Sequence, residues 1–146
     1  MHIGSQTLSM NKILLIFVIS GMLSACSATK KGTNQQLSGN WELALFPTTD
    51  KTFDEVFGQR RPYLQFDASN NKVSGSTGCN RLSGSFSTGK ESFSFGNNMI
   101  TTKMACPGYE ESSFMNALLK TNKYKIENGQ LKFFHDSTLV MAFSKK

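Results

Sequence analysis

The segment GSTGCNRLSG, residues 75–84, and the segment TTKMAC, residues 101–106, carry the strongest structural signal in this chain. Glycines beside a cysteine and an asparagine are typical of a backbone that needs positive φ angles or the close approach of a second segment. We therefore expect Gly75 and Gly78 at a bulge or tight turn, and Asn80 bonded to backbone groups nearby. The pair Cys79 and Cys106 favours a covalent link between the two segments.

Short runs that alternate apolar and polar residues lie on both sides of these segments, and this is the pattern of half-buried strands. The connections between the runs are rich in Asp, Asn, Ser and Gly, and Asn128-Gly129 is a strong hairpin signal. In the first run, Trp41, Leu43 and Leu45 are expected to share one face. We expect strands at residues 40–46, 63–66, 72–76, 84–88, 92–95, 123–127, 130–134 and 138–143.

One segment has the period of a helix instead. In residues 109–120, Phe114, Ala117 and Leu118 recur at three- and four-residue spacing, and Glu110 and Glu111 stand in the first turn, where the helix dipole favours acidic groups. About eight strands with one substantial helix predict an α+β fold, built on a curved, mainly antiparallel sheet or a partly closed barrel.

The chain contains 12 Phe residues, many of them at alternating positions of the expected strands. Their simplest role is to fill the core of the sheet. A barrel of this strand number can also hold a small ligand, so an apolar cavity for an acyl chain or another lipid is the alternative.

The N-terminal residues have the organisation of a secretion signal. Lys12 precedes an unbroken apolar run at residues 13–19, which is too short to span a bilayer. Residues 1–25 are therefore expected to be a signal peptide, with Met10 as the true start. The sequence Leu23-Ser-Ala-Cys26 resembles the bacterial lipobox, which implies that the mature protein begins at Cys26 and that this cysteine carries acyl chains such as palmitate.

Attachment through two or three acyl chains would be close to irreversible, because each buried methylene contributes about 0.8 kcal/mol. Ser27 stands where an Asp would resemble an inner-membrane retention signal, so we expect anchoring in the outer membrane, facing the periplasm. Residues 26–36 are expected to form the lipidated cysteine and a flexible, polar tether. Residues 37–146 are long enough for a single domain.

The chain has a formal net charge of +6, from 16 Lys and Arg against 10 Asp and Glu. Such a surplus attracts anionic surfaces such as lipid headgroups, lipopolysaccharide or wall polymers. The lysines are scattered, however, and a mixed solvated surface accounts for them more simply. No cluster of basic and aromatic residues recurs, so nucleic acid is not an expected partner.

With Cys26 assigned to the lipid, Cys79 and Cys106 remain as an even pair in an oxidising compartment, and a disulfide is the favoured prediction. Two buried reduced thiols, or a redox-active or nucleophilic cysteine, are the alternatives. A nucleophile needs a nearby base, yet the neighbours His135 and Asp136 would point to opposite faces of a strand. No carboxylate pair or metal-ligand spacing stands out, so no catalytic residue, metal or cofactor is expected.

The segments at residues 75–84 and 101–106, together with the expected strands and helix around them, resemble the META domain family in their order along the chain. This is the family of the heat-inducible lipoprotein HslJ. The resemblance covers nearly all of residues 37–143, with residues 47–61 as a variable connection. It implies a small envelope or secreted domain, linked to stress and to tolerance of toxic compounds, with no established reaction or cofactor. The family motif comprises Gly75, Gly78, Cys79, Asn80, Gly84, Met104, Ala105 and Cys106.

Together these observations favour a non-enzymatic envelope lipoprotein that supports envelope stress tolerance by contact with a protein or with the surface. Binding of a lipid or hydrophobic small molecule in the sheet or barrel is one alternative. Inhibition of a wall-degrading enzyme is another, because other small β-rich lipoproteins act in that way. The expected partners are the membrane, through the lipid anchor, and an envelope protein or a lipid ligand.

Overall fold

The computed structural model describes residues 33–47, 51–109 and 111–146. The expected signal peptide at residues 1–25 and the expected lipidation site at Cys26 lie outside the described residues. In chain order the elements are α2 (Thr33–Leu37), β1 (Gly39–Leu45), α3 (Phe53–Phe57), β2 (Tyr63–Asp67), β3 (Lys72–Ser76), β4 (Arg81–Thr88), β5 (Phe93–Phe95), β6 (Ile100–Thr101), α4 (Glu111–Lys120), β7 (Lys123–Glu127), β8 (Gln130–His135) and β9 (Thr138–Lys145).

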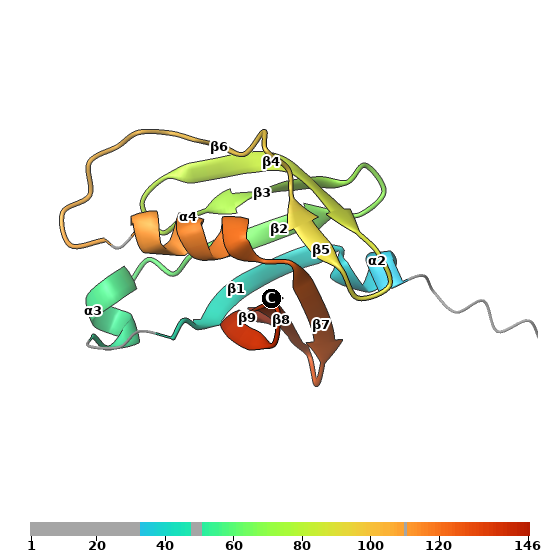
Figure 1. Cartoon of the computed structure of the whole chain (residues 1–146). Helices are drawn as coiled ribbons and strands as arrows, with labels where there is room; N and C mark the ends of the chain where they lie inside the picture. The colour runs from blue at the N-terminus through green and yellow to red at the C-terminus, as the bar shows by residue number, and fades with distance from the viewer. Residues whose placement is uncertain (1–32, 48–50, 110) are drawn as a thin grey trace, which may run out of the picture. The chain divides into compact units, whose positions relative to one another are not determined.

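The strands form one antiparallel sheet in the order β5-β4-β3-β2-β1-β9-β8-β7, with β6 paired to β4 (Figure 1). Most neighbours in the sheet are also neighbours in sequence. The exceptions are β6, which pairs with β4, and the pair β1 and β9, which brings the two ends of the domain together in the middle of the sheet. This arrangement confirms the predicted α+β fold on a curved antiparallel sheet.

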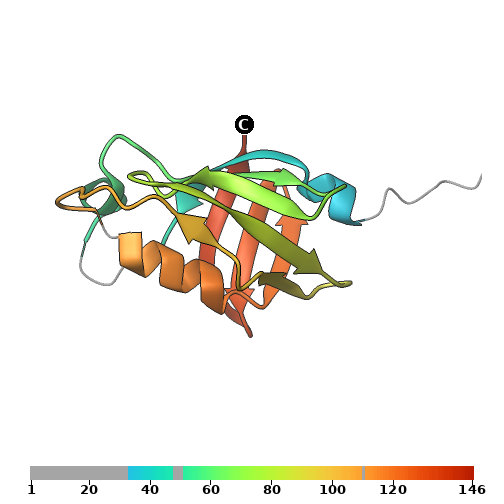
Figure 2. The ribbon, with the colours of Figure 1, turned by 90° about the horizontal axis from the view of Figure 1, so that it is seen from above.

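The two outermost strands, β5 and β7, approach each other and nearly close the sheet into a barrel. Ser92 and Lys123 form an isolated antiparallel bridge between them, and the backbone N–H of Phe93 donates to the carbonyl of Asn122 at 3.0 Å. Seen from above, the C-terminal strands (orange to red) cross the N-terminal strands (cyan to olive) at a steep angle (Figure 2). Such a crossing is expected where a strongly twisted sheet curls onto itself.

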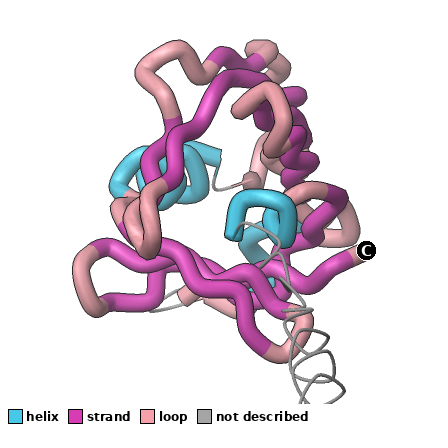
Figure 3. The backbone as a smooth tube through the Cα atoms, turned by 90° about the vertical axis from the view of Figure 1, so that its right-hand side faces the viewer, coloured by secondary structure: helices cyan, strands magenta, loops and turns pink. Residues whose placement is uncertain are grey.

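Helix α4 lies beside the barrel between its two strand layers, as the side view of the backbone shows (Figure 3). Its residues Phe114 and Leu118, one turn apart, are fully buried. This is the apolar stripe that the helical period predicts for a helix covering a core.

Aromatic rings in mutual contact occupy the inside of the barrel. Phe93 and Phe133 lie at the centre of this group, with ring centroids 4.8 Å apart. Around them are Phe66, Phe86, Phe95, Tyr124 and Phe143, all of them buried. Edge-to-face and tilted contacts of this kind stabilise a core beyond the area that they bury. The packing favours a filled interior over a cavity for an acyl chain.

A second group of rings packs beneath the connection between β1 and β2. Helix α3 within this connection starts with a capping box, in which Thr52 and Glu55 bond each other's backbone N–H. Its Phe57 contacts Phe114 of α4, with ring centroids 6.1 Å apart. Residues 47–61, interpreted above only as a variable connection, therefore contribute a helix to the core.

The described structure includes a helix at residues where the sequence pattern predicts a flexible tether. Helix α2 spans Thr33–Leu37, within and just after the expected tether at residues 26–36. Leu37 is fully buried, and its carbonyl accepts a 2.7 Å hydrogen bond from Nε1 of Trp41. Because the short helix satisfies this buried indole, it belongs to the domain and not to a tether.

The expected shared face of the first strand is interrupted at its end. Trp41 and Leu43 are buried as predicted, but Leu45 is 46% exposed. The register of β1 against β9 shifts between Leu43 and Leu45. Such a shift turns the following side chains away from the core, so simple alternation was wrong at Leu45.

Candidate functional site

The family motif builds the turn between β3 and β4. Gly78 has φ +94°, and a Cβ there would lie 2.5 Å from the carbonyl oxygen of Arg60. Gly75 has an ordinary φ, but a Cβ would collide with the carbonyl oxygen of Tyr63 on β2. Gly78 is therefore needed both for its backbone conformation and for the close approach of Arg60. Gly75 is needed only for the close approach of Tyr63.

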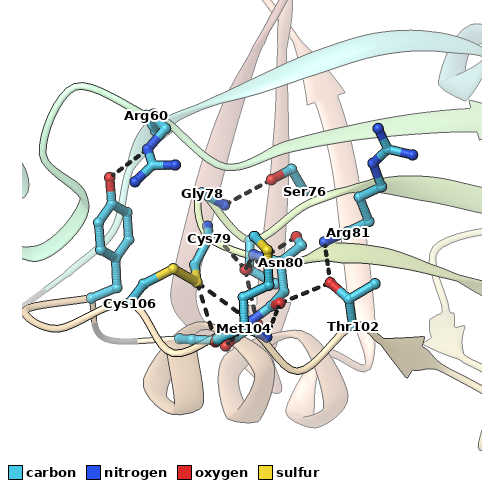
Figure 4. Close-up of a disulfide and its surroundings, with 12 residues drawn as sticks. Arg60, Ser76, Gly78, Cys79, Asn80, Arg81, Thr102, Met104 and Cys106 are labelled. Carbon is cyan, nitrogen blue, oxygen red and sulfur yellow. Dashed lines mark hydrogen bonds between the residues drawn. A yellow bond between two sulfur atoms is a disulfide. The ribbon is translucent and has the colours of Figure 1, made fainter.

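Asn80 follows this turn and joins it to the segment at residues 102–104 (Figure 4). Its Oδ1 accepts hydrogen bonds from the backbone N–H of Met104 (2.7 Å) and the hydroxyl of Thr102 (2.8 Å). Its Nδ2 donates to the carboxylate of Glu111 (2.7 Å) and to the carbonyl of Met104 (3.2 Å). With only 1% of its surface exposed, Asn80 is a buried polar residue whose side-chain hydrogen-bonding groups are satisfied within the protein.

Thr77 and Glu111 complete this network, which we call the Asn80 clasp: Thr77, Asn80, Thr102, Met104 and Glu111. The fully buried Thr77 hydroxyl donates to Glu111 at 2.9 Å and accepts from the backbone N–H of Asn80 at 2.9 Å. The sequence pattern predicts Glu111 only as a charge at the start of a helix and indicates no role for Thr77. The signal for Thr77 was its place immediately before the Gly-Cys-Asn motif, where a threonine can bond the backbone of a turn.

A disulfide joins Cys79 and Cys106 beside the clasp, with their Cα atoms 6.0 Å apart. Of the remaining motif residues, Met104 and Ala105 lie in the segment just before Cys106, and their side chains are exposed. Gly84 lies further along β4, where a Cβ would collide with Sδ of Met99. The structure thus places most of the motif in one junction and Gly84 outside it.

Arg60 and Tyr109 lie over the motif turn. The guanidinium Nε of Arg60 donates to the Tyr109 hydroxyl at 3.3 Å, and a Cβ on Gly78 would lie 3.2 Å from the Tyr109 ring. A side chain at position 78 would therefore also displace this pair.

The outward face of β2, β3 and β4 carries two adjoining open hollows, of about 540 and 460 Å³. They share the lining residues Gln65, Ser74, Ser83 and Ile100. Because they meet along these shared residues, we treat them as one groove and call it the β3–β4 groove.

Charged side chains elsewhere on the surface pair with each other. On the outward face of β7 and β8, Glu127 lies 2.6 Å from Lys125 and 2.8 Å from Lys132. Hydrogen bonds from Lys125 and Lys132 lower the pKa of Glu127 to about 2. This partly exposed trio has the geometry of a surface ion-pair network and not of an acid–base site.

His135 lies at the end of β8, half exposed, with Nδ1 2.8 Å from the carbonyl of Lys120. Its neighbour Asp136 bonds Asn122 and lies 3.9 Å from the imidazole. This geometry is that of a hairpin-end surface residue. Within the described ranges, no group of three or more His, Cys, Asp or Glu side chains could hold a metal ion. None of the described helices is long and apolar enough to cross a membrane.

The fold and the clasp define a class of protein: a small α+β domain on a nearly closed antiparallel sheet, with a disulfide fastening one turn to a distant loop. The match to a family model is more specific. The chain belongs to the META domain family, whose model matches residues 34–146.

Solved structures of similar fold come from distant proteins. An NMR structure of a protein from Burkholderia xenovorans is 24% identical, with a TM-score of 0.58, and the match covers 77% of this chain and 86% of that chain. The crystal structure of a DUF4847 family protein from Bacteroides vulgatus ATCC 8482 is 12% identical, with a TM-score of 0.56 over 75% of this chain and 93% of that chain. At these identities the likeness shows the fold alone. No curated protein matches the chain.

Proposed function

We propose that this chain is a bacterial envelope lipoprotein, anchored through Cys26, whose META domain acts by binding and not by catalysis. The observation that carries the proposal is the use of the family motif. The side-chain hydrogen-bonding groups of Asn80 are buried and paired within the clasp, and the two motif cysteines are bonded to each other. The motif therefore serves the fold, and the exposed surface is left for recognition.

The disulfide also supports the proposed location. Disulfides persist in oxidising compartments such as the periplasm and are rare in the cytosol. The pairing of Cys79 with Cys106 leaves Cys26 as the third and last cysteine of the chain, at the position where the lipobox-like sequence requires it.

Lipidation is tested by growing cells that express the full chain with an alkyne analogue of palmitate and detecting the label on the protein. We expect labelling of the unchanged chain and none of the Cys26→Ser variant. The matched control is Cys106→Ser, which should still be labelled. An unlabelled parent chain, or a labelled Cys26→Ser variant, would overturn the anchor.

A role in envelope stress tolerance follows from the family resemblance and is part of the same proposal. A strain lacking the gene should lose tolerance to heat or to a toxic hydrophobic compound and regain it with the full chain. Rescue by Cys26→Ser at the same protein level would show that the domain acts without the lipid anchor.

Binding of a hydrophobic small molecule has less structural support, because rings in contact occupy the barrel interior. Native mass spectrometry of the chain purified without refolding tests it, and a lipid-sized adduct would revive it. Inhibition of a wall-degrading enzyme stays a prediction, tested by protection of cells against lysozyme.

A further inference from the structure

We propose that the β3–β4 groove binds a strand of anionic glycan, a polymer of sugar rings that carries carboxylates or phosphates. The inference rests on the proposed binding function and names its surface and its ligand class.

The register aligns outward side chains of three strands into rows across the sheet. Tyr63, Ser76 and Arg81 are opposite one another and form the first row. Two residues further along, Gln65, Ser74 and Ser83 form the second, and β6 extends it with Ile100. Asp67, Lys72 and Ser85 form the third. Four residues of strand separate the first row from the third, which gives a groove about 13 Å long.

The groove exists because short side chains lie between longer ones. Serines occupy the outward positions of β3 and β4 in the middle row, with Gln65 on one side and Ile100 on the other. The wall around Ile100 is fixed in place, because the backbone N–H of Thr102 donates to the Arg81 carbonyl at 3.0 Å and Met99 packs over Gly84. A preformed groove does not have to be ordered when a ligand binds, and this favours affinity.

The side chains in the groove match the chemistry of a sugar. Serine hydroxyls and the Gln65 amide offer both donors and acceptors, which a chain of hydroxyl groups can satisfy. Tyr63 is 43% exposed at one end of the groove, so one face of a flat aromatic ring is available to pack against the apolar face of a sugar ring. Tyr63 and Ile100 are the large apolar or aromatic side chains exposed along the groove, and its other outward side chains are polar.

The charges at the groove favour an anionic ligand. Asp67 is engaged in its own turn, where Oδ1 accepts from Ser69 and Oδ2 from Asn70. Across the described part of the chain, neither Arg81 nor Lys72 has a carboxylate within ion-pair distance, but the register places Asp67 opposite Lys72. Figure 4 shows the Arg81 side chain extending away from the clasp. Arg81 is therefore an unpaired cation at one end of the groove, and Lys72 lies beside Asp67 at the other end.

An extended peptide fits this face less well. Peptides that add to a sheet need a free strand edge, but β2 pairs with both β1 and β3, and β3 pairs with both β2 and β4. The backbone of β2 and β3 beneath the groove is therefore already paired, and recognition over these strands must come from side chains.

The test is calorimetric titration of the full chain in detergent with three soluble probes: peptidoglycan glycan strands bearing carboxylates, phosphorylated core oligosaccharide from lipopolysaccharide, and neutral dextran of similar length. We expect one or both acidic probes to bind, at least tenfold more tightly than dextran, and to weaken as salt is added. Which acidic probe binds more tightly identifies the source of the glycan.

Two variants tie binding to the groove. Arg81→Ala removes one cation and should weaken binding about tenfold, the effect of losing one hydrogen bond to a charged group. Ser74→Tyr places a large side chain in the middle of the groove, at an exposed strand position, and should weaken binding at least as much. The controls are Lys90→Ala, a cation outside the groove, and Ser94→Tyr, an exposed strand serine outside it. All four variants should keep the melting temperature of the parent chain.

Failure of both acidic probes to bind, equal binding of dextran, or equal effects of the groove variants and their controls would overturn the inference. These results concern a surface in vitro and leave palmitate labelling of Cys26 unaffected. Conversely, an unlabelled chain would overturn the anchor without touching the groove. The two proposals therefore fail separately.

Discussion

Replacing Asn80 by alanine tests whether the clasp holds the domain together. The change removes the acceptor for Met104 N–H and the Thr102 hydroxyl, and the donor to Glu111 and the Met104 carbonyl. A neutral hydrogen bond contributes about 1 kcal/mol and one to a charged group about 1.5–3 kcal/mol. Water can reach the partly exposed partners, so we expect a loss of about 2–4 kcal/mol in the free energy of unfolding.

The assay is equilibrium unfolding in urea with the disulfide intact, followed by tryptophan fluorescence and circular dichroism. Asn98→Ala is the matched control, because Asn98 is an exposed asparagine whose Oδ1 accepts from Ser85. It should cost less than about 1 kcal/mol. A loss below about 1 kcal/mol for Asn80→Ala, at an unchanged denaturant slope, would refute the clasp as a main source of stability.

Four further predictions concern stability. Serine at both motif cysteines should cost about 3–4 kcal/mol in urea unfolding, since the bond spans 27 residues, and a loss below 1 kcal/mol would contradict the chain-entropy argument. Gly78→Ala should cost at least about 1 kcal/mol more than Gly108→Ala, because both have positive φ but only Gly78 faces a backbone oxygen; equal losses would argue against that clash. The folded-state pKa of Glu127 is depressed from 4.5 to about 2, so its contribution is present above pH 4.5 and lost as pH falls toward 2. The difference in the free energy of unfolding between the parent and Glu127→Gln should narrow over that range, and a constant difference would count against a stabilising role of the ion pairs. Tyr124→Phe should preserve or raise the melting temperature, because the buried Tyr124 hydroxyl has no partner among the described residues; a marked fall would reveal a partner.

Local pattern predicted most strands well because strands such as β2, β3 and β5 alternate buried and outward side chains. The hairpin at Asn128-Gly129 was equally readable, and both residues have the positive φ angles that such a turn requires. Strand β6 was not predicted, because it is only two residues long and its position depends on the contact between Met99 and Gly84. Helix α3 carried a readable capping signal at Thr52, which alternation alone does not detect.

The residues of the candidate sites were also predictable from the sequence only in part. The cysteines and Asn80 stood out by residue type, and the structure brings them together. The partnership of Asn80 with Glu111 joins residues 31 positions apart, and only the folded chain places them in contact. The groove depends on strand register, which sets Ser74 opposite Ser83 and cannot be obtained from either strand alone.

Because the pair β1 and β9 lies in the middle of the sheet, the domain can form only when nearly all of its chain is present. Trp41 on the first strand faces Lys145 on the last, so the sheet cannot be joined until nearly the whole chain is available. A chain that ends before Thr138 would keep the hairpins on each side but would lack the strand that unites them. It would present two unpaired edges instead of one continuous sheet, and such edges invite aggregation and proteolysis. Premature termination should therefore give a product that is cleared and not a partly working domain.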